Sequence, residues 1–117
     1  MTPQHFISSI RSEVLEQNWA DYQSALREES VSGSTSQYWP KMAKFNLSLN
    51  QEQRKQFEMT IRQVMVDTIS NILGILDGTS ILEHYRGDFN LTYSDDKKQL
   101  NGDLQTFFLA AEQEKKQ

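Results

Sequence analysis

The sequence predicts an α+β fold, mainly helical, in which a long central helix is packed by an N-terminal helix, a β-hairpin and a short C-terminal helix. Three observations lead to this prediction. Two long stretches have helical apolar spacing, one short stretch alternates with a period of two, and a serine-rich break separates the helical stretches. The 117 residues match the size of one domain. We therefore expect residues 1–117 to form a single domain.

The first helix is predicted from Thr2 to about Glu29. Thr2 suits the N-cap, and Pro3 stands at the first helical position, where proline is tolerated. Apolar residues between Leu15 and Leu26 are spaced by four, three and four, which places them on one face. The opposite, solvent-facing side is expected to carry polar and charged residues: Arg11, Glu13, Glu16, Gln17 and Asp21.

A flexible loop is predicted at about 31–47, because this stretch begins with serines and glycine and then stays aperiodic. Within it, Tyr38 and Trp39 place a large aromatic area immediately before Pro40. Two interpretations remain open. Trp39 covers the central helix, or Tyr38 and Trp39 contact a partner, since aromatic residues often dominate protein interfaces.

The central helix is predicted to begin near Ser48 or Asn50, each with a glutamine three residues later, as in a capping box. It should end at Leu76 or Asp77, followed by Gly78 as a left-handed C-cap. The second half of this helix, 64–76, is apolar around most of its circumference and needs cover on several sides. A homodimer is therefore one expectation for this chain.

A β-hairpin is predicted from two short segments, Ile81–Tyr85 and Phe89–Tyr93, joined by a turn at Gly87. The last helix should open at Leu100 or Asn101. The tail, about 112–117, is expected to fray.

Composition excludes several classes of protein. The net charge is −4, and basic residues do not cluster, which argues against nucleic-acid binding. No apolar run approaches the roughly 20 residues of a membrane span. The chain has no cysteine, so thiolate chemistry and disulfides are ruled out, and a cytoplasmic location is expected.

Catalytic and metal-binding patterns are not evident. Serines do not stand in nucleophile motifs, carboxylates lack metal-ligand spacing, and we expect no cofactor. His84 is the better placed of two histidines, between Glu83 and Tyr85. Together with Tyr85 and Tyr93 it suggests an alternative function, a small-molecule site or modest enzyme between the central helix and the hairpin.

Two runs, Ile72–Gly78 and Leu100–Leu104 with the following Phe107 and Phe108, resemble small bacterial domains. Some domains of this size and acidity are immunity proteins encoded beside toxins. The function predicted is a non-catalytic protein-binding module of the immunity or antitoxin type. Its candidate binding residues are Tyr38, Trp39, His84, Tyr85 and Tyr93. A third possibility is a structural homodimer subunit of a larger assembly.

Overall fold

Helices make up 68% of the chain, and the described residues contain no β-strand, so the predicted α+β class is wrong and the fold is helical. This computed structural model describes residues 1–28 and 37–116. Its elements in chain order are α1 (Pro3–Ile10), the π-helical segment η1 (Arg11–Glu16), α2 (Gln17–Ala25), α3 (Tyr38–Ser48), α4 (Gln51–Asp77) and α5 (Leu104–Lys116). Because α1, η1 and α2 follow without a break, they form one long helix.

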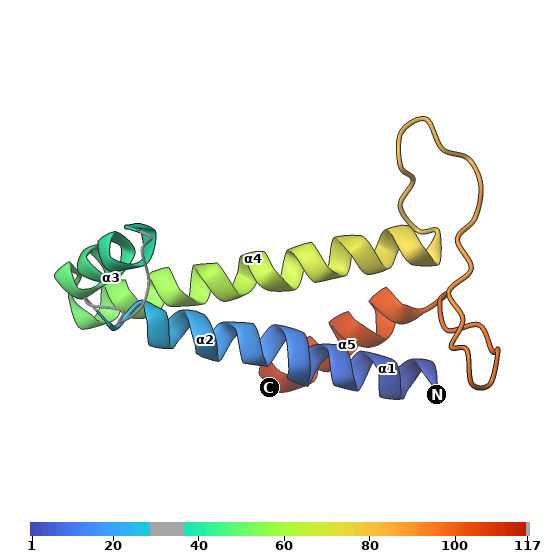
Figure 1. Ribbon diagram of the computed structural model, residues 1–117, viewed down its shortest axis with the longest axis horizontal. Coiled ribbons are helices and arrows are strands. Elements are labelled where there is room, and N and C mark those ends of the chain that lie inside the picture. The colour runs from blue at the N-terminus through green and yellow to red at the C-terminus, as the bar shows by residue number, and fades with distance from the viewer. Residues whose placement is uncertain (29–36, 117) are drawn as a thin grey trace.

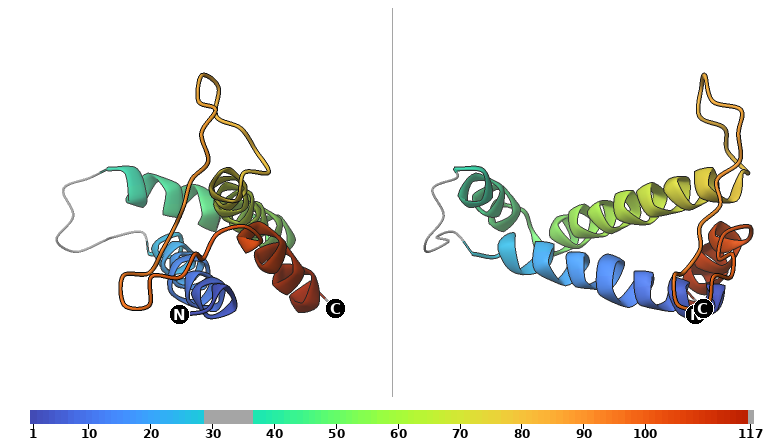
Figure 2. Two further views of the ribbon diagram at one scale, coloured as in Figure 1. Left: turned by 90° about the vertical axis from the view of Figure 1, so that its right-hand side faces the viewer. Right: turned by 45° about the vertical axis from the view of Figure 1, so that its right-hand side comes forward.

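The two long helices, α1–η1–α2 and α4, lie close together at one end of the molecule and diverge toward the other (Figure 1). The short helix α5 packs against both α1 and α4 in the space between them (Figure 2). The helix α3 lies at the end of the molecule where α2 and α4 are closest, away from α1 (Figure 1). The connection between α4 and α5, residues 78–103, extends beyond the other end of α4 (Figure 1).

One apolar cluster holds the long helices and α5 together. Its fully buried members come from α1, η1, α4 and α5: Ile7, Leu15, Val66, Leu73, Leu104 and Phe108. Burying side chains of this size stabilises a fold by about 1.5–3 kcal/mol each. Leu104 and Phe108 have no exposed surface, so α5 contributes the most deeply buried side chains of the core together with Leu15.

The helix ends confirm the local signals in the sequence. The Thr2 hydroxyl accepts a hydrogen bond of 3.0 Å from the His5 backbone N–H, as expected of an N-cap. Asn50 and Gln53 form a reciprocal capping box at the start of α4, with hydrogen bonds of 2.8 and 3.1 Å. Gly78 has a φ of +83° and ends α4 in the left-handed conformation.

The predicted β-hairpin is absent from the described residues. All of 81–90 is exposed, and Thr92, in the second predicted strand, forms an isolated bridge with Gln99 instead of pairing with Ile81–Tyr85. The side chain of Asn101 takes backbone groups that a partner strand would pair. It donates to the carbonyl of Phe89 at 2.9 Å and accepts from the N–H of Leu91 at 2.8 Å. A period-two pattern without a second strand to pair with therefore formed a loop.

The segment predicted as the later part of a loop, 38–47, belongs to the helix α3; the earlier part, 31–36, lies outside the described residues. Pro40 stands in the first turn of α3, where a proline's missing N–H breaks no intrahelical hydrogen bond. At the other end, α5 begins at Leu104 rather than at Leu100. It continues to Lys116, past the point where fraying is expected.

Candidate functional site

The five residues predicted to bind a partner lie at the two ends of α4. Tyr38 and Trp39 open α3 at one end, whereas His84, Tyr85 and Tyr93 belong to the connection beyond the other end. The 27 residues of α4 span about 40 Å at 1.5 Å per residue. The structure therefore does not bring these residues together as one site.

Trp39 packs against aromatic residues of α2 and α3. Its ring meets the Tyr22 ring edge-on, with centroids 5.1 Å apart, and it meets the Tyr38 ring in the same way at 5.1 Å. Because Tyr22 belongs to α2, Trp39 fixes the start of α3 to the N-terminal helix. That Trp39 also covers the central helix stays a prediction.

The His84 side chain is 81% exposed, and its nearest carboxylate, that of Glu83, lies 3.7 Å away. The backbone φ of His84 is +75°, so the positive φ expected at Gly87 occurs at His84 instead. Among the described residues, no hydroxyl is hydrogen-bonded to this imidazole. His84 is thus presented to solvent and does not form a site with Tyr93.

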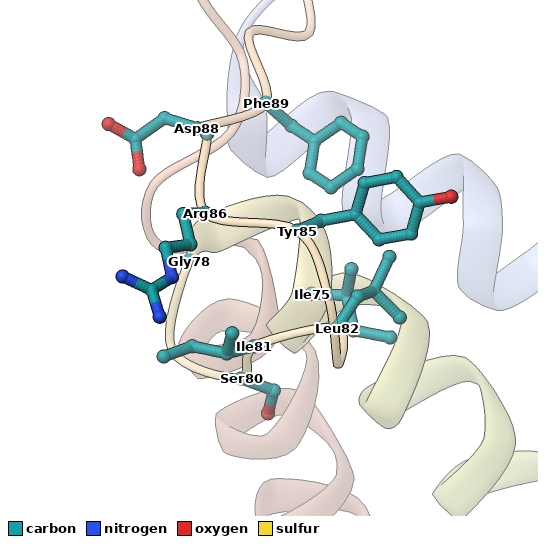
Figure 3. Close-up of a pocket in the computed structure, with 10 residues that line it drawn as sticks. Ile75, Gly78, Ser80, Ile81, Leu82, Tyr85, Arg86, Asp88 and Phe89 are labelled. Carbon is teal, nitrogen blue, oxygen red and sulfur yellow. The ribbon is translucent and has the colours of Figure 1, made fainter.

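A shallow pocket of about 360 Å³ lies where the 79–90 loop leaves the end of α4. Four apolar or aromatic side chains lie on the same side of this loop (Figure 3): Ile75, Leu82, Tyr85 and Phe89. Arg86 and Asp88 point away from them (Figure 3). Of the histidine and two tyrosines predicted here, only Tyr85 lines the pocket. Such a lining can hold another apolar group, with the charged side chains remaining in water.

The same apolar character continues along α4. Six residues, spaced by four, three, four, four and three, share one side of the helix and are called here the α4 face: Phe57, Ile61, Val64, Thr68, Ile72 and Ile75. Val64 is 60% exposed and Ile72 is 53% exposed, which is unusual for aliphatic side chains in the middle of a long helix. No described helix covers this side of α4 between α3 and the 79–90 loop (Figure 1).

The α4 face extends at both ends and carries no charge. At one end the ring of Phe57 meets that of Phe45 on α3 edge-on, at 5.4 Å, and Phe45 is itself exposed. At the other end Ile75 joins the apolar side of the 79–90 loop. Between residues 59 and 76 the charged residues are Arg62, which is buried, and Asp67, which lies about 100° around the helix from Thr68. Depletion of charge is a property of interface cores.

A network of charged side chains lies between the helices. Arg62 and Glu112 are buried, and Arg11 and Glu16, which the sequence placed in solvent, are partly buried. Arg62 of α4 makes two hydrogen bonds to the carboxylate of Glu112 on α5, at 2.8 and 3.0 Å. Arg11 of η1 donates to the same carboxylate at 2.7 Å. Glu16 accepts from Arg62 and from Lys115, the latter at 2.9 Å. This Arg62–Glu112 network ties three helices together.

The network shifts the titration of its members. Hydrogen bonds from Arg62, and further ones from Arg11, lower the pKa of Glu112 to about 2 despite its burial. The bonds to Glu112 in turn raise the pKa of Arg62. Burial raises the pKa of Glu16, but hydrogen bonds from Lys115 and Arg62 outweigh this effect, so its pKa lies below the usual value. Glu16, Arg62 and Glu112 are therefore charged at neutral pH, and none of the three has the near-neutral pKa of a general acid or base.

A second buried polar cluster holds α3 against α2 and α4. The Glu58 carboxylate accepts from Asn46 at 3.3 Å and from Arg27 at 3.0 Å. The Asn46 amide also donates to the Leu26 carbonyl at 3.1 Å. Arg54 binds carbonyl oxygens at the end of α3, two of them at 3.1 and 3.2 Å. These contacts position α3 and its Phe45 beside the start of α4.

Neither metal binding nor membrane insertion finds support in this geometry. Within 1–28 and 37–116, no three histidine or acidic side chains converge as metal ligands would. None of the helices in these ranges has both the length and the apolar content needed to cross a bilayer. Comparison of the chain with protein-family models, curated proteins and solved structures finds no match.

Proposed function

We propose that this chain is a non-catalytic protein-binding module, and that its binding surface is the α4 face together with the apolar side of the 79–90 loop. The observation that carries the proposal is the exposure of Val64 and Ile72 on the α4 face, whose six residues are all uncharged. Contiguous exposed apolar surface on a soluble fold marks an interaction site in most cases. Binding here would act by covering a surface rather than by chemistry.

The surface proposed differs from the one expected from the sequence. Tyr85 remains part of it, whereas Tyr38 and Trp39 serve to pack α3 against α2. An immunity or antitoxin role would use the α4 face to occlude a partner. The lack of cysteine is compatible with our further proposal that the protein works in the reducing cytoplasm.

The alternative, a small-molecule site, has less support. The pocket beside the 79–90 loop has a volume of about 360 Å³, near the low end of the range for ligand sites. His84 and Tyr93 do not line it, so the polar groups that would orient a ligand are missing from the predicted set. An apolar groove on a protein-binding surface explains the same volume.

Site-specific photo-cross-linking tests the proposal. A photoreactive amino acid replaces Val64 in one variant and Gln63, on the polar side of α4, in the control. Both residues are exposed, so neither change disturbs the core. After irradiation of cells producing each variant, we expect polypeptide adducts at position 64 that are absent or several-fold weaker at position 63. Equal adduct yields at the two positions would contradict the proposed surface.

A further inference from the structure

We infer that the α4 face is covered by the α4 face of a second copy of this chain, with the two α4 helices antiparallel about a two-fold axis. This inference rests on the proposed protein-binding function and names its partner. Three features of the described residues support it: the spacing of the face, the charges at its two ends, and the apolar residues at those ends.

The spacing of the α4 face suits a second helix lying along it. From Phe57 to Ile75 every gap is three or four residues, which keeps the side chains in one line, as at helix–helix seams. This line runs over 18 residue steps, or about 27 Å. A two-fold axis near its midpoint, at the level of Val66, sets Phe57 of one copy beside Ile75 of the other. Both copies then use the same surface, and each contact is made twice, as in a closed two-fold dimer.

The charges at the two ends of the face favour the antiparallel orientation. The helix α3, at one end, carries Lys41 and Lys44 and no acidic residue. The 79–90 loop, at the other end, has a net charge of −1 from Glu83, Asp88 and Arg86, of which Arg86 and Asp88 point away from its apolar side (Figure 3). Antiparallel pairing brings the lysines of each copy to the acidic loop of the other. Parallel pairing would instead set lysines against lysines, which is unfavourable.

The apolar residues at the ends match in the same orientation. Phe45 of α3 is exposed next to Phe57, and Leu82 and Phe89 are exposed next to Ile75. Antiparallel pairing therefore places Phe45 of one copy near the apolar side of the other copy's loop. The parallel arrangement would bury the two loops against each other and leave the helix end without a complementary surface.

The size of the interface requires these ends to take part. A helix about 10 Å wide and 27 Å long covers a footprint of about 270 Å². Stable interfaces bury about 800 Å² on each partner. The α4 face alone is too small for such an interface, so the inferred dimer also requires contacts between α3 and the 79–90 loop, which the two-fold axis makes twice.

The first experiment measures mass in solution as a function of protein concentration, by sedimentation equilibrium. We expect the wild-type chain to move from monomer to dimer mass as the concentration rises. The double variant Val64→Asp with Ile72→Asp should stay monomeric, because it places charges at the centre of the interface. The matched control, Gln56→Asp with Gln63→Asp, adds the same charge on the polar side and should dimerise like wild type. Circular dichroism confirms that each variant is folded.

The second experiment tests the orientation. The chain contains no cysteine, so a single introduced cysteine is the only site that a maleimide cross-linker can use. The two variants are Ser48→Cys and Ser80→Cys, each nearly isosteric with the wild type. Ser48 shares a side of α3 with Phe45, and Ser80 lines the pocket at the other end of α4. With a short bis-maleimide linker, we expect a mixed product between the two variants. Products of each variant with itself alone, without the mixed product, would show a parallel dimer and overturn the inference.

The outcomes also separate this inference from the proposed function. A wild-type chain that is monomeric at every concentration, or a dimer that survives Val64→Asp with Ile72→Asp, overturns the inference. If adducts at position 64 then contain a different protein, the protein-binding function stands and only the identity of the partner is wrong. If position 64 gives no adduct at all, both proposals fail.

Discussion

Parts of the inner and outer sides of α4 depart from the distribution usual for an amphipathic helix. On the inner side, Glu58 and Arg62 are buried and paired with residues from other helices. On the outer side, Val64 and Ile72 are exposed. The usual arrangement has apolar residues inside and charged residues in water. The comparison shows that ion pairs accompany the apolar cluster where the helices meet, and that apolar residues stay exposed on the outer side.

The two sides have different consequences for stability. A buried charge is costly without its partner, and the ion pairs on the inner side form only in one arrangement of α4 against α5 and η1. Exposed residues on the outer side do not depend on one arrangement of the helices, because they already contact water. Changes on the inner side should therefore unfold the protein, and changes on the outer side should leave the fold intact and affect association.

The largest expected effect is from Arg62→Met, which keeps the volume of the side chain but removes its charge. Glu112 then loses two hydrogen bonds, and its carboxylate, 5% exposed, keeps only Arg11 as a charged partner. Breaking a buried pair in this way costs about 3–5 kcal/mol of the free energy of unfolding. Urea denaturation measures the loss. The control is Gln63→Ala on the exposed side of the same helix, and equal losses in both variants would show that the network does not stabilise the bundle.

The next effect concerns the dependence of stability on pH. Since the pKa of Glu112 is about 2 in the folded chain against 4.5 ordinarily, its stabilisation is complete above pH 4.5 and is lost as the pH falls toward 2. The loss should amount to about 2–3 kcal/mol. We expect the stability of the Glu112→Gln variant to fall less over this interval than that of the wild type. Parallel curves for the two proteins would contradict the assignment.

A smaller effect is expected at the junction between the bundle and the 78–103 connection. The Asp77 carboxylate accepts hydrogen bonds from the backbone N–H groups of Gly102, Leu104 and Gln105, at 2.7 to 3.1 Å, and so caps α5. Asp77→Ala should cost about 1–2 kcal/mol by removing this cap. Asp77→Asn keeps a side-chain oxygen and should cost less. Thermal unfolding compares the two, and an equal cost for both would mean that the oxygen is not the stabilising group.

The parts of this fold that could be predicted from the sequence are those set by neighbouring residues. Thr2 with Pro3, Asn50 with Gln53, and Gly78 each act within one helical turn, and each confirmed its helix end. Contacts distant in sequence could not be read in this way. Arg11 and Glu16 belong to the polar side of their helix by spacing alone, and only their contacts with α5, about 100 residues later, bury them.

The same distinction explains the errors in the candidate site. Alternation at 89–93 predicted a strand, but a strand also needs a partner, and Asn101 binds the backbone instead. Tyr38 and Tyr85 were expected in one binding surface, although α4 separates them. The apolar excess of 64–76 was the useful signal. It indicated a surface in need of cover, and the structure shows which side of α4 that is.

The smallest effect on the isolated chain is expected on the outer side. Valine and aspartate have similar helix propensities, and surface substitutions usually change stability by less than about 0.5 kcal/mol. In dilute solution, Val64→Asp with Ile72→Asp should therefore unfold at nearly the wild-type denaturant concentration. At high protein concentration the wild type should become more stable, because a partner that binds only the folded state shifts the equilibrium, and the variant should not change. A variant that is strongly destabilised even when dilute would show that this side of α4 is part of the core.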